Sequence, residues 1–312
     1  MNIIVPITVT ESMLGAGTTI AEPDSGVGEV AWSSASVAYA VGAEVVRTTT
    51  HRIYRCAVAH TSAASPLPED DPTRWVDVAP TNRHAPFDAY TSTAASGTTT
   101  ETWVLSPGYF NAIALYGLTG SSYSITVKDE PSGTTIYTAT GYLTEDPLGW
   151  YEYLFGVPRT RNKLVCTGIP PRPEAELTIT ITAGSGQPVG LGMLVVGDYT
   201  PVIGSDATWG GTLGGAQAEP RSNSYFRMND DGSVQIRRRV AATDLTVRAA
   251  MPRAKADQAL ALMQSVLDVP VACIVTNTPG YDGLNVFGLA SARLGYVSNN
   301  TAEIDITVRG MI

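Results

Sequence analysis

The chain of 312 residues is poor in charge, in cysteine and in long apolar runs. Charged residues make up only 16 % of it, and it has three cysteines. Cys56, Cys166 and Cys273 lie far apart in apolar segments without a CxxC pair, so we expect buried free thiols. The N-terminus lacks a basic start followed by a long apolar stretch. We therefore expect no signal peptide, no membrane insertion, and synthesis in the cytoplasm.

Basic surface is also scarce. The net charge is −9 and the pI is near 4.8, so no stripe is available to neutralise phosphates and we expect no nucleic-acid partner. The densest basic run, Arg237-Arg238-Arg239, follows the alternating Ser233–Ile236. It indicates a strand with solvated arginines, or else a contact with an acidic partner. The low charge overall favours a surface partly covered by neighbouring proteins.

Patterns that carry chemistry are missing as well. The three histidines, His51, His60 and His84, form no HxH, HxxxH or HExxH pair, so we predict no metal site. Gly184-Ser185-Gly186 departs from the GxSxG pattern, and Gly190-Leu191-Gly192 lacks the third glycine of a phosphate loop. We predict no catalytic residue, no cofactor and no enzyme activity. Two carboxylates converging from separate elements would escape this search, so a glycan-cleaving site stays open.

What the chain does contain is a mainly β pattern. Leu177, Ile179 and Ile181 alternate with threonines, and Ile304, Ile306 and Val308 alternate with polar residues, as half-buried strands do. Residues 110–116 read as a buried strand, and Gly192–Gly197 as another. Asn229–Gly232 predicts a hairpin turn. One helix is predicted at about 252–268, with Pro252 as its first residue and one apolar face.

Composition shifts divide the chain into four predicted parts. Residues 1–31 form an N-terminal arm, and residues 32–88 a small aromatic-rich module. Residues 89–200 form a β-sandwich or jelly-roll-like domain. Residues 201–312 form a β-rich α+β domain that holds the one predicted helix. We expect Thr91–Thr100 to be a linker, because it is rich in Thr, Ser and Gly.

The module's aromatic residues are the one candidate binding site. They are Trp32, Tyr39, Tyr54 and Trp75. A segment of about 55 residues has little core, and large aromatics could supply it. Exposed Trp or Tyr rings could instead stack on the apolar C–H faces of sugars. The sequence leaves both readings open.

The order of residues in the module resembles a known family. Trp32, Tyr39-Ala40-Val41-Gly42, Val45, Tyr54, Pro68 and Trp75 are arranged as in the small carbohydrate-binding modules of chitinases and in a related module of bacteriophage tail proteins. The following Pro80-Thr81-Asn82-Arg83 and Phe87-Asp88 are similar to the junction of the phage versions. Ser106–Asn111, Gly192–Gly197 and the ending Val308-Arg309-Gly310 extend the resemblance over most of the chain.

The resemblance implies a minor tail protein, at the tail tip or baseplate of a long-tailed bacteriophage virion. Such a protein is a structural component that acts by homo-oligomerisation and by docking on other phage tail proteins. The alternative is recognition of a host-surface glycan, and a remoter one is an envelope-polysaccharide depolymerase. Iron–sulfur tail-tip proteins carry more cysteines than this chain, so the resemblance adds no cofactor.

Overall fold

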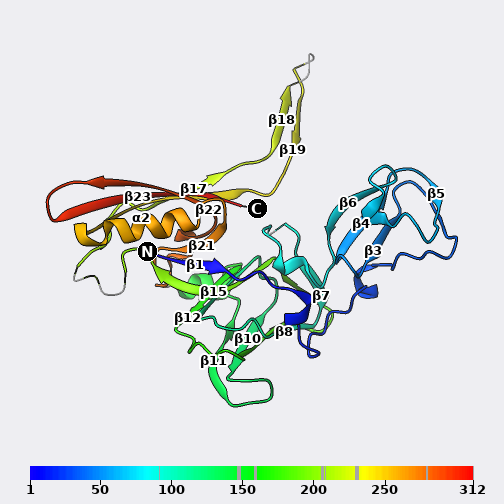
Figure 1. Ribbon diagram of the computed structural model, residues 1–312, viewed down its shortest axis with the longest axis horizontal. Coiled ribbons are helices and arrows are strands. Elements are labelled where there is room, and N and C mark those ends of the chain that lie inside the picture. The colour runs from blue at the N-terminus through cyan, green and yellow to red at the C-terminus, as the bar shows by residue number, and fades with distance from the viewer. Residues whose placement is uncertain are drawn as a thin grey trace.

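The computed structural model describes residues 1–90, 92–145, 149–157, 160–204, 207, 209–228, 232–278 and 280–311. The protein is mainly β, as the sequence predicts. Figure 1 shows the small module at one side, a sandwich in the middle and a sheet covered by a helix at the other side. Among the described residues, no helix is long and apolar enough to cross a membrane.

A ten-stranded sheet runs through most of the molecule. The N-terminal strand β1 lies at its centre, antiparallel to β15 on one side and to β21 on the other. The predicted boundary at residue 200 therefore falls inside β15, in a sheet that residues 89–200 and 201–312 share. The strand order is β12 (Lys163–Thr167), β9 (Ala112–Tyr116), β15 (Met193–Pro201), β1 (Asn2–Pro6), β21 (Pro270–Ile274), β22 (Asn285–Tyr296), β23 (Thr301–Gly310), β20 (Ala242–Pro252) and β16 (Gly211–Thr212), with β17 (Gln217–Arg221) also paired to β20.

A second sheet packs on the β9–β15 part of the first and makes the predicted sandwich. Alternation in β13 places Leu177, Ile179 and Ile181 in the core with no exposed surface, which confirms the period-two prediction. The predicted linker at residues 91–100 contains a short strand, β7, paired with β14. The strands of this layer are β11 (Thr135–Tyr142), β10 (Ser122–Lys128), β13 (Glu176–Thr182) and β8 (Thr100–Leu105), flanked by β7 (Ala95–Thr98) and β14 (Pro188–Leu191).

The predicted helix is present but shorter. Helix α2 (Ala256–Ser265) follows a 3-10 turn, η5 (Arg253–Lys255), and packs against the sheet that holds β22. Pro252 is not its first residue, because β20 continues to Pro252, which pairs with Thr301 of β23. Met251 is fully buried, so the strand's last residues are held by the core. Ala256, Ala259 and Met263 are buried on the helix face that the sequence predicts.

The module is a small three-stranded sheet with few apolar residues behind it. Its strands pair antiparallel in the order β3, β4, β6. The segment between residues 61 and 73 includes a 3-10 turn, η3 (Pro68–Asp70). The remaining elements of this region are β2 (Ala38–Tyr39), β3 (Glu44–Arg47), β4 (Arg52–Cys56), β5 (His60–Thr61), β6 (Trp75–Pro80), η1 (Glu11–Met13), η2 (Ser25–Val27) and η4 (Ala85–Phe87).

Candidate functional site

The four aromatic residues of the module converge, but only two keep exposed surface. Tyr54 and Trp75 are 7 % and 3 % exposed and form a small core with Val45 and Cys56. Trp32 and Tyr39 are partly buried at the edge of this core. A ring that stacks on a sugar needs an accessible face. Sugar binding therefore stays a prediction for Trp32 and Tyr39, while Tyr54 and Trp75 lie in the core.

Trp32 also carries a charged neighbour. The Arg47 guanidinium lies 4.9 Å from the centre of the Trp32 ring, which is cation–π distance. Arg47 donates two hydrogen bonds to Glu69, of 2.9 and 2.8 Å, as a bidentate arginine–carboxylate pair. The hydrogen bond from Arg47 is the main cause that lowers the pKa of Glu69. One side of the Trp32 ring is thus occupied by a fixed cation.

A hairpin arm projects from the C-terminal part of the molecule (Figure 1). Strands β18 (Tyr225–Met228) and β19 (Val234–Arg237) pair antiparallel, which confirms the predicted hairpin. Of its predicted turn, residues 229–231 lie outside the described residues. Because side chains alternate along a strand, the arm has two unlike faces. Phe226, Ile236, Met228 and Val234 share the apolar face, and all four are exposed, by 44–65 %.

The other side of the arm is basic. Arg227 and Arg237 alternate with the apolar residues, and Arg238 and Arg239 follow. At the base of the arm an open cleft of about 600 Å³ is lined by Arg221, Arg239 and Arg309, together with Tyr90, Ser92, Val240, Gly310 and Met311. The arginine run therefore follows a projecting strand, as the alternation predicts, and its last member lines a cleft. This arrangement suits an acidic and apolar partner.

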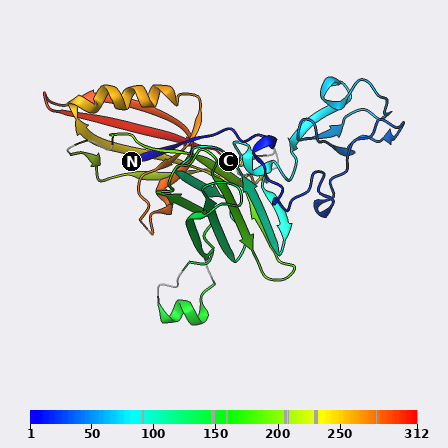
Figure 2. The same ribbon diagram turned by 60° about the horizontal axis from the view of Figure 1, so that its bottom comes forward.

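A short aromatic helix projects from the sandwich, and no sequence pattern predicted it. Helix α1 (Trp150–Phe155) is the green helix below the sheets in Figure 2. Trp150 is 83 % exposed and Phe155 is 73 % exposed, and Tyr151, Tyr153 and Leu154 are also exposed. The only available signal was the density of aromatic residues in Trp150–Phe155, which shows neither strand nor amphipathic helix spacing.

A dense polar network lies where the N-terminal arm (residues 1–31), the module and the sandwich meet. Thr81 and Asn82, in the segment that resembles phage junctions, are buried. The Asn82 side chain donates to Asp24 at 2.6 Å and to the Ser96 carbonyl at 2.8 Å, and its oxygen accepts from the Ser96 amide at 2.8 Å. Its backbone amide donates to Glu29 at 2.6 Å. Asn82 thereby fastens the segment 24–29 to the start of β7.

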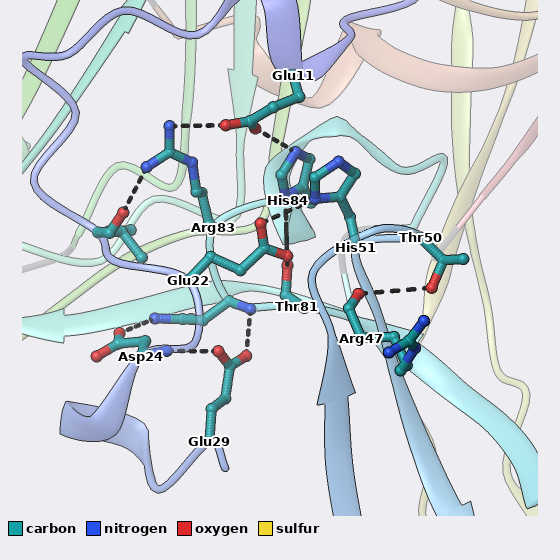
Figure 3. Close-up of polar contacts among 12 residues, drawn as sticks. Glu11, Glu22, Asp24, Glu29, Arg47, Thr50, His51, Thr81, Arg83 and His84 are labelled. Atoms are coloured by element: carbon teal, nitrogen blue, oxygen red, sulfur yellow. Dashed lines mark hydrogen bonds and ion pairs between the residues drawn. The ribbon is translucent and has the colours of Figure 1, made fainter. Parts of the chain in front are cut away.

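His51 and His84 meet beside this network (Figure 3). Their rings stack with centres 4.0 Å apart and 27° between planes. His51 Nδ1 lies 2.8 Å from Glu22 Oε2, and His84 Nε2 lies 3.0 Å from Glu11 Oε2. Burial, and then the charge of His51, lower the pKa of His84, while Glu22 and Glu11 oppose the shift. Within the part of the chain that the structure describes, these two histidines and two glutamates form the cluster whose side chains could hold a metal ion.

A cleft of about 340 Å³ opens next to the junction. Val30, Val46 and Ile53 give it an apolar wall, and Glu29 and Glu44 supply acidic groups. It lies between the segment 27–30, the module and residues 92–94. None of the four predicted aromatic residues lines this cleft, so it is separate from the module edge that carries Trp32 and Tyr39.

No protein-family model and no curated protein sequence matches the chain. Chitosan-binding module 1 of a chitosanase/glucanase from Paenibacillus sp. IK-5 is 17 % identical, with a TM-score of 0.25 over 36 % of this chain and 82 % of that chain. An F5/8 type C domain from Bacteroides fragilis is 15 % identical, with a TM-score of 0.26 over 51 % of this chain and 95 % of that chain. Likenesses this distant carry no conclusion about function.

Proposed function

We propose that this protein is a structural subunit of a larger assembly, which associates with further copies of itself through the β18–β19 arm. The observation that carries the proposal is the apolar face of the arm, Phe226, Met228, Val234 and Ile236, exposed on a two-stranded hairpin. An isolated hairpin is marginally stable in water, and exposed apolar patches mark interaction sites. A neighbouring molecule that covers this face would stabilise the arm.

Charge favours a second copy as that neighbour. Arg227, Arg237, Arg238 and Arg239 put one fifth of the chain's 20 Lys and Arg residues on or beside the arm, although the whole chain has a net charge of −9. The body therefore presents acidic surface to a basic arm. Helix α1 supplies exposed aromatic side chains. An arm that reaches from each copy to the next would make a head-to-tail contact, which closes into a ring when the rotation allows.

Self-association is tested by light scattering after size exclusion. We expect the full chain to form an oligomer at micromolar concentration, and the double variant Phe226→Asp/Ile236→Asp to be monomeric. Both residues are about 60 % exposed, so the variant should keep its fold and melting temperature. The matched control Tyr142→Asp changes a strand residue that is 77 % exposed outside the arm, and should stay oligomeric. A monomeric wild-type chain would overturn the proposal.

The assembly that we propose is the tail tip or baseplate of a long-tailed phage, on the resemblance of the junction Pro80–Arg83 and the module. Its test is independent of self-association. Mass spectrometry of purified particles should detect the chain in the virion, and a reconstruction should place symmetric copies at the tail tip. Absence from the particles would reject the tail assignment and leave the arm as an oligomerisation device.

Recognition of a host glycan is the second candidate function, favoured by the partial exposure of Trp32 and Tyr39. Trp32→Ala and Tyr39→Ala should abolish binding on a glycan array, and each should lower the melting temperature less than Trp75→Ala does, because both rings are only partly buried. Trp75→Ala is unsuitable for this test, because Trp75 is 3 % exposed and its loss should unfold the module. A wild-type chain that binds no host polysaccharide would remove this candidate.

A further inference from the structure

The His51–His84 pair and two glutamates stand out as a set of metal donors. Glu11 lies in η1, and Glu22 lies in the segment before η2. His51 lies in the turn between β3 and β4, and His84 directly precedes η4. Each offers one ligand atom, and the four atoms all lie within 4.8 Å of one another. Figure 3 shows the four side chains pointing toward one another. We propose that they form a binding site for a divalent transition metal ion, with Zn²⁺ as the expected occupant.

The spacing of the donors fits a four-coordinate ion after small rotations. Zinc binds His nitrogen and carboxylate oxygen at about 2.0–2.2 Å, so neighbouring ligand atoms of a tetrahedron lie about 3.3–3.5 Å apart. The observed spread of up to 4.8 Å requires the widest pair to close by roughly 1.5 Å. Rotation of a carboxylate or an imidazole about its side-chain bonds covers such a distance. The two closest pairs, at 2.8 and 3.0 Å, would open slightly.

His84 is poorly satisfied without a cation. His84 Nε2 is buried and lies 3.0 Å from Glu11 Oε2, yet it has no hydrogen bond of good geometry to any described residue. Its Nδ1 faces Thr81 Oγ1 at 3.3 Å and Glu22 Oε1 at 3.7 Å. A neutral imidazole presents a lone pair on one nitrogen, and a lone pair facing a carboxylate oxygen is repulsive. A cation placed between them turns that repulsion into two bonds.

Neighbouring side chains hold the carboxylates, as supporting residues do around metal sites. Thr81 Oγ1 donates to Glu22 Oε1 at 2.7 Å. Arg83 Nη2 donates to Glu11 Oε1 at 3.2 Å, while Arg83 Nη1 is fixed by the Ile20 carbonyl at 3.1 Å. Glu22 is 8 % exposed, so its charge needs compensation. With two glutamates and one arginine in the cluster, a dication leaves a net charge near +1.

The donor types select the metal class. Imidazole nitrogen suits Zn, Cu, Ni and Fe, whereas Ca²⁺ and Mg²⁺ take oxygen ligands. Two neutral imidazoles and two carboxylates are a donor set that Zn²⁺ accepts, because its filled d shell imposes no geometric preference. Because the four ligands come from the N-terminal arm, the module and the junction, the ion would tie the module to the body. Its expected effect is therefore on the stability and orientation of the module.

Metal titration of the full chain tests the site directly. After removal of metal with a chelator, calorimetry with Zn²⁺ alone should show one ion bound per chain. His51→Ala and His84→Ala should each weaken Zn²⁺ binding by more than about 10–100-fold, the loss typical for a supporting partner. Zn²⁺ should also raise the melting temperature of the wild-type chain but not of these variants. Wild-type chain that binds no Zn²⁺ would overturn the proposal.

His60 supplies the matched control. It lies in the same module beside Trp75, with Cys56 Sγ 3.7 Å from its Nδ1, and it is not one of the four donors. His60→Ala should leave Zn²⁺ affinity unchanged, and a loss there would move the site to Cys56 and His60 and reject the proposed set. Glu11→Gln keeps the test valid if the histidine variants fail to fold, because the Glu11 side chain is 44 % exposed. It should weaken Zn²⁺ binding in a folded chain, and unchanged affinity would remove Glu11 from the site.

Discussion

Single side chains in the module are held by ion pairs as well as by the small core. Arg47 lies over Trp32 and binds Glu69, so one guanidinium connects the ring at the module's edge with η3. The Arg47 and Glu69 side chains are 15 % and 20 % exposed, which screens this pair less than a surface pair. A module with little apolar core depends on such contacts more than the sandwich does.

Glu69→Gln should make the module less sensitive to acid. The pKa of Glu69 is lowered in the folded chain by the hydrogen bond from Arg47, so its stabilisation is present above the unfolded pKa, near 4.3. That stabilisation is lost as pH falls through the folded pKa. We expect Glu69→Gln to lower stability by about 1 kcal/mol at pH 7, and this loss to shrink as pH falls through the folded pKa of Glu69.

Thermal melts of the two proteins from pH 7 to pH 3 measure the difference. Glu44→Gln is the control, because Glu44 also pairs with an arginine, Arg55, but both side chains are about half exposed. It should change the melting temperature less at neutral pH. If Glu69→Gln and Glu44→Gln lowered the melting temperature equally at pH 7, the Arg47–Glu69 pair would not stabilise the module more than an exposed pair does.

The sequence predicts which side chains point inward where a strand alternates, as Ile179 and Ile304 show by their complete burial. It could not decide between core and ligand for the module aromatics, since burial of Trp75 depends on how β4 and β6 pair. The contact between His51 and His84 could not be predicted from the sequence either. Their contact arises from the turn after β3 and the chain after β6, and no spacing along the sequence encodes it.

The two α-helices among the described residues differ in how they relate to the core. Helix α2 buries Ala256, Ala259 and Met263 on one face, so apolar spacing predicted it. Its start was mispredicted because Pro252 serves as the last residue of β20, where a missing amide at a strand end is tolerated. Helix α1 has no buried residue, so its sequence carries no core-facing period.

Helix α1 should be dispensable for folding. Because Trp150 and Phe155 are more than 70 % exposed, the double variant Trp150→Ser/Phe155→Ser should change the melting temperature by less than about 1 °C. It should also reduce binding of a hydrophobic fluorescent dye to the native chain. Trp103→Ala is the contrast, since Trp103 is fully buried in the sandwich core and its loss should cost about 3–5 kcal/mol. A strongly destabilised Trp150→Ser/Phe155→Ser chain would show that α1 packs on the body.

The whole molecule is organised by its first strand. Composition divides residues 1–31, 89–200 and 201–312 into separate parts, yet β1 pairs Ile3 with Thr200 on one side and with Cys273 on the other. Ile3 and Ile4 are fully buried and belong to two different core clusters, on opposite faces of the sheet. Local composition cannot reveal such long-range pairing. Residues 89–311 should therefore unfold with β1 as one cooperative unit.

Gly197→Ala tests this shared sheet. Gly197 pairs with Pro6 of β1 and with Ala112 of β9, and an added Cβ would lie 1.9 Å from the Val5 carbonyl oxygen. The backbones must move apart, so we expect a loss of about 1–3 kcal/mol, as for other overpacked sites. Gly211→Ala, in edge strand β16 with open space around its Cβ, should be nearly neutral. Calorimetry should show a single unfolding transition for Gly197→Ala, at a lower temperature than for the wild-type chain. If residues 89–200 of the wild-type chain melted separately from residues 201–311, β1 would not join them into one unit.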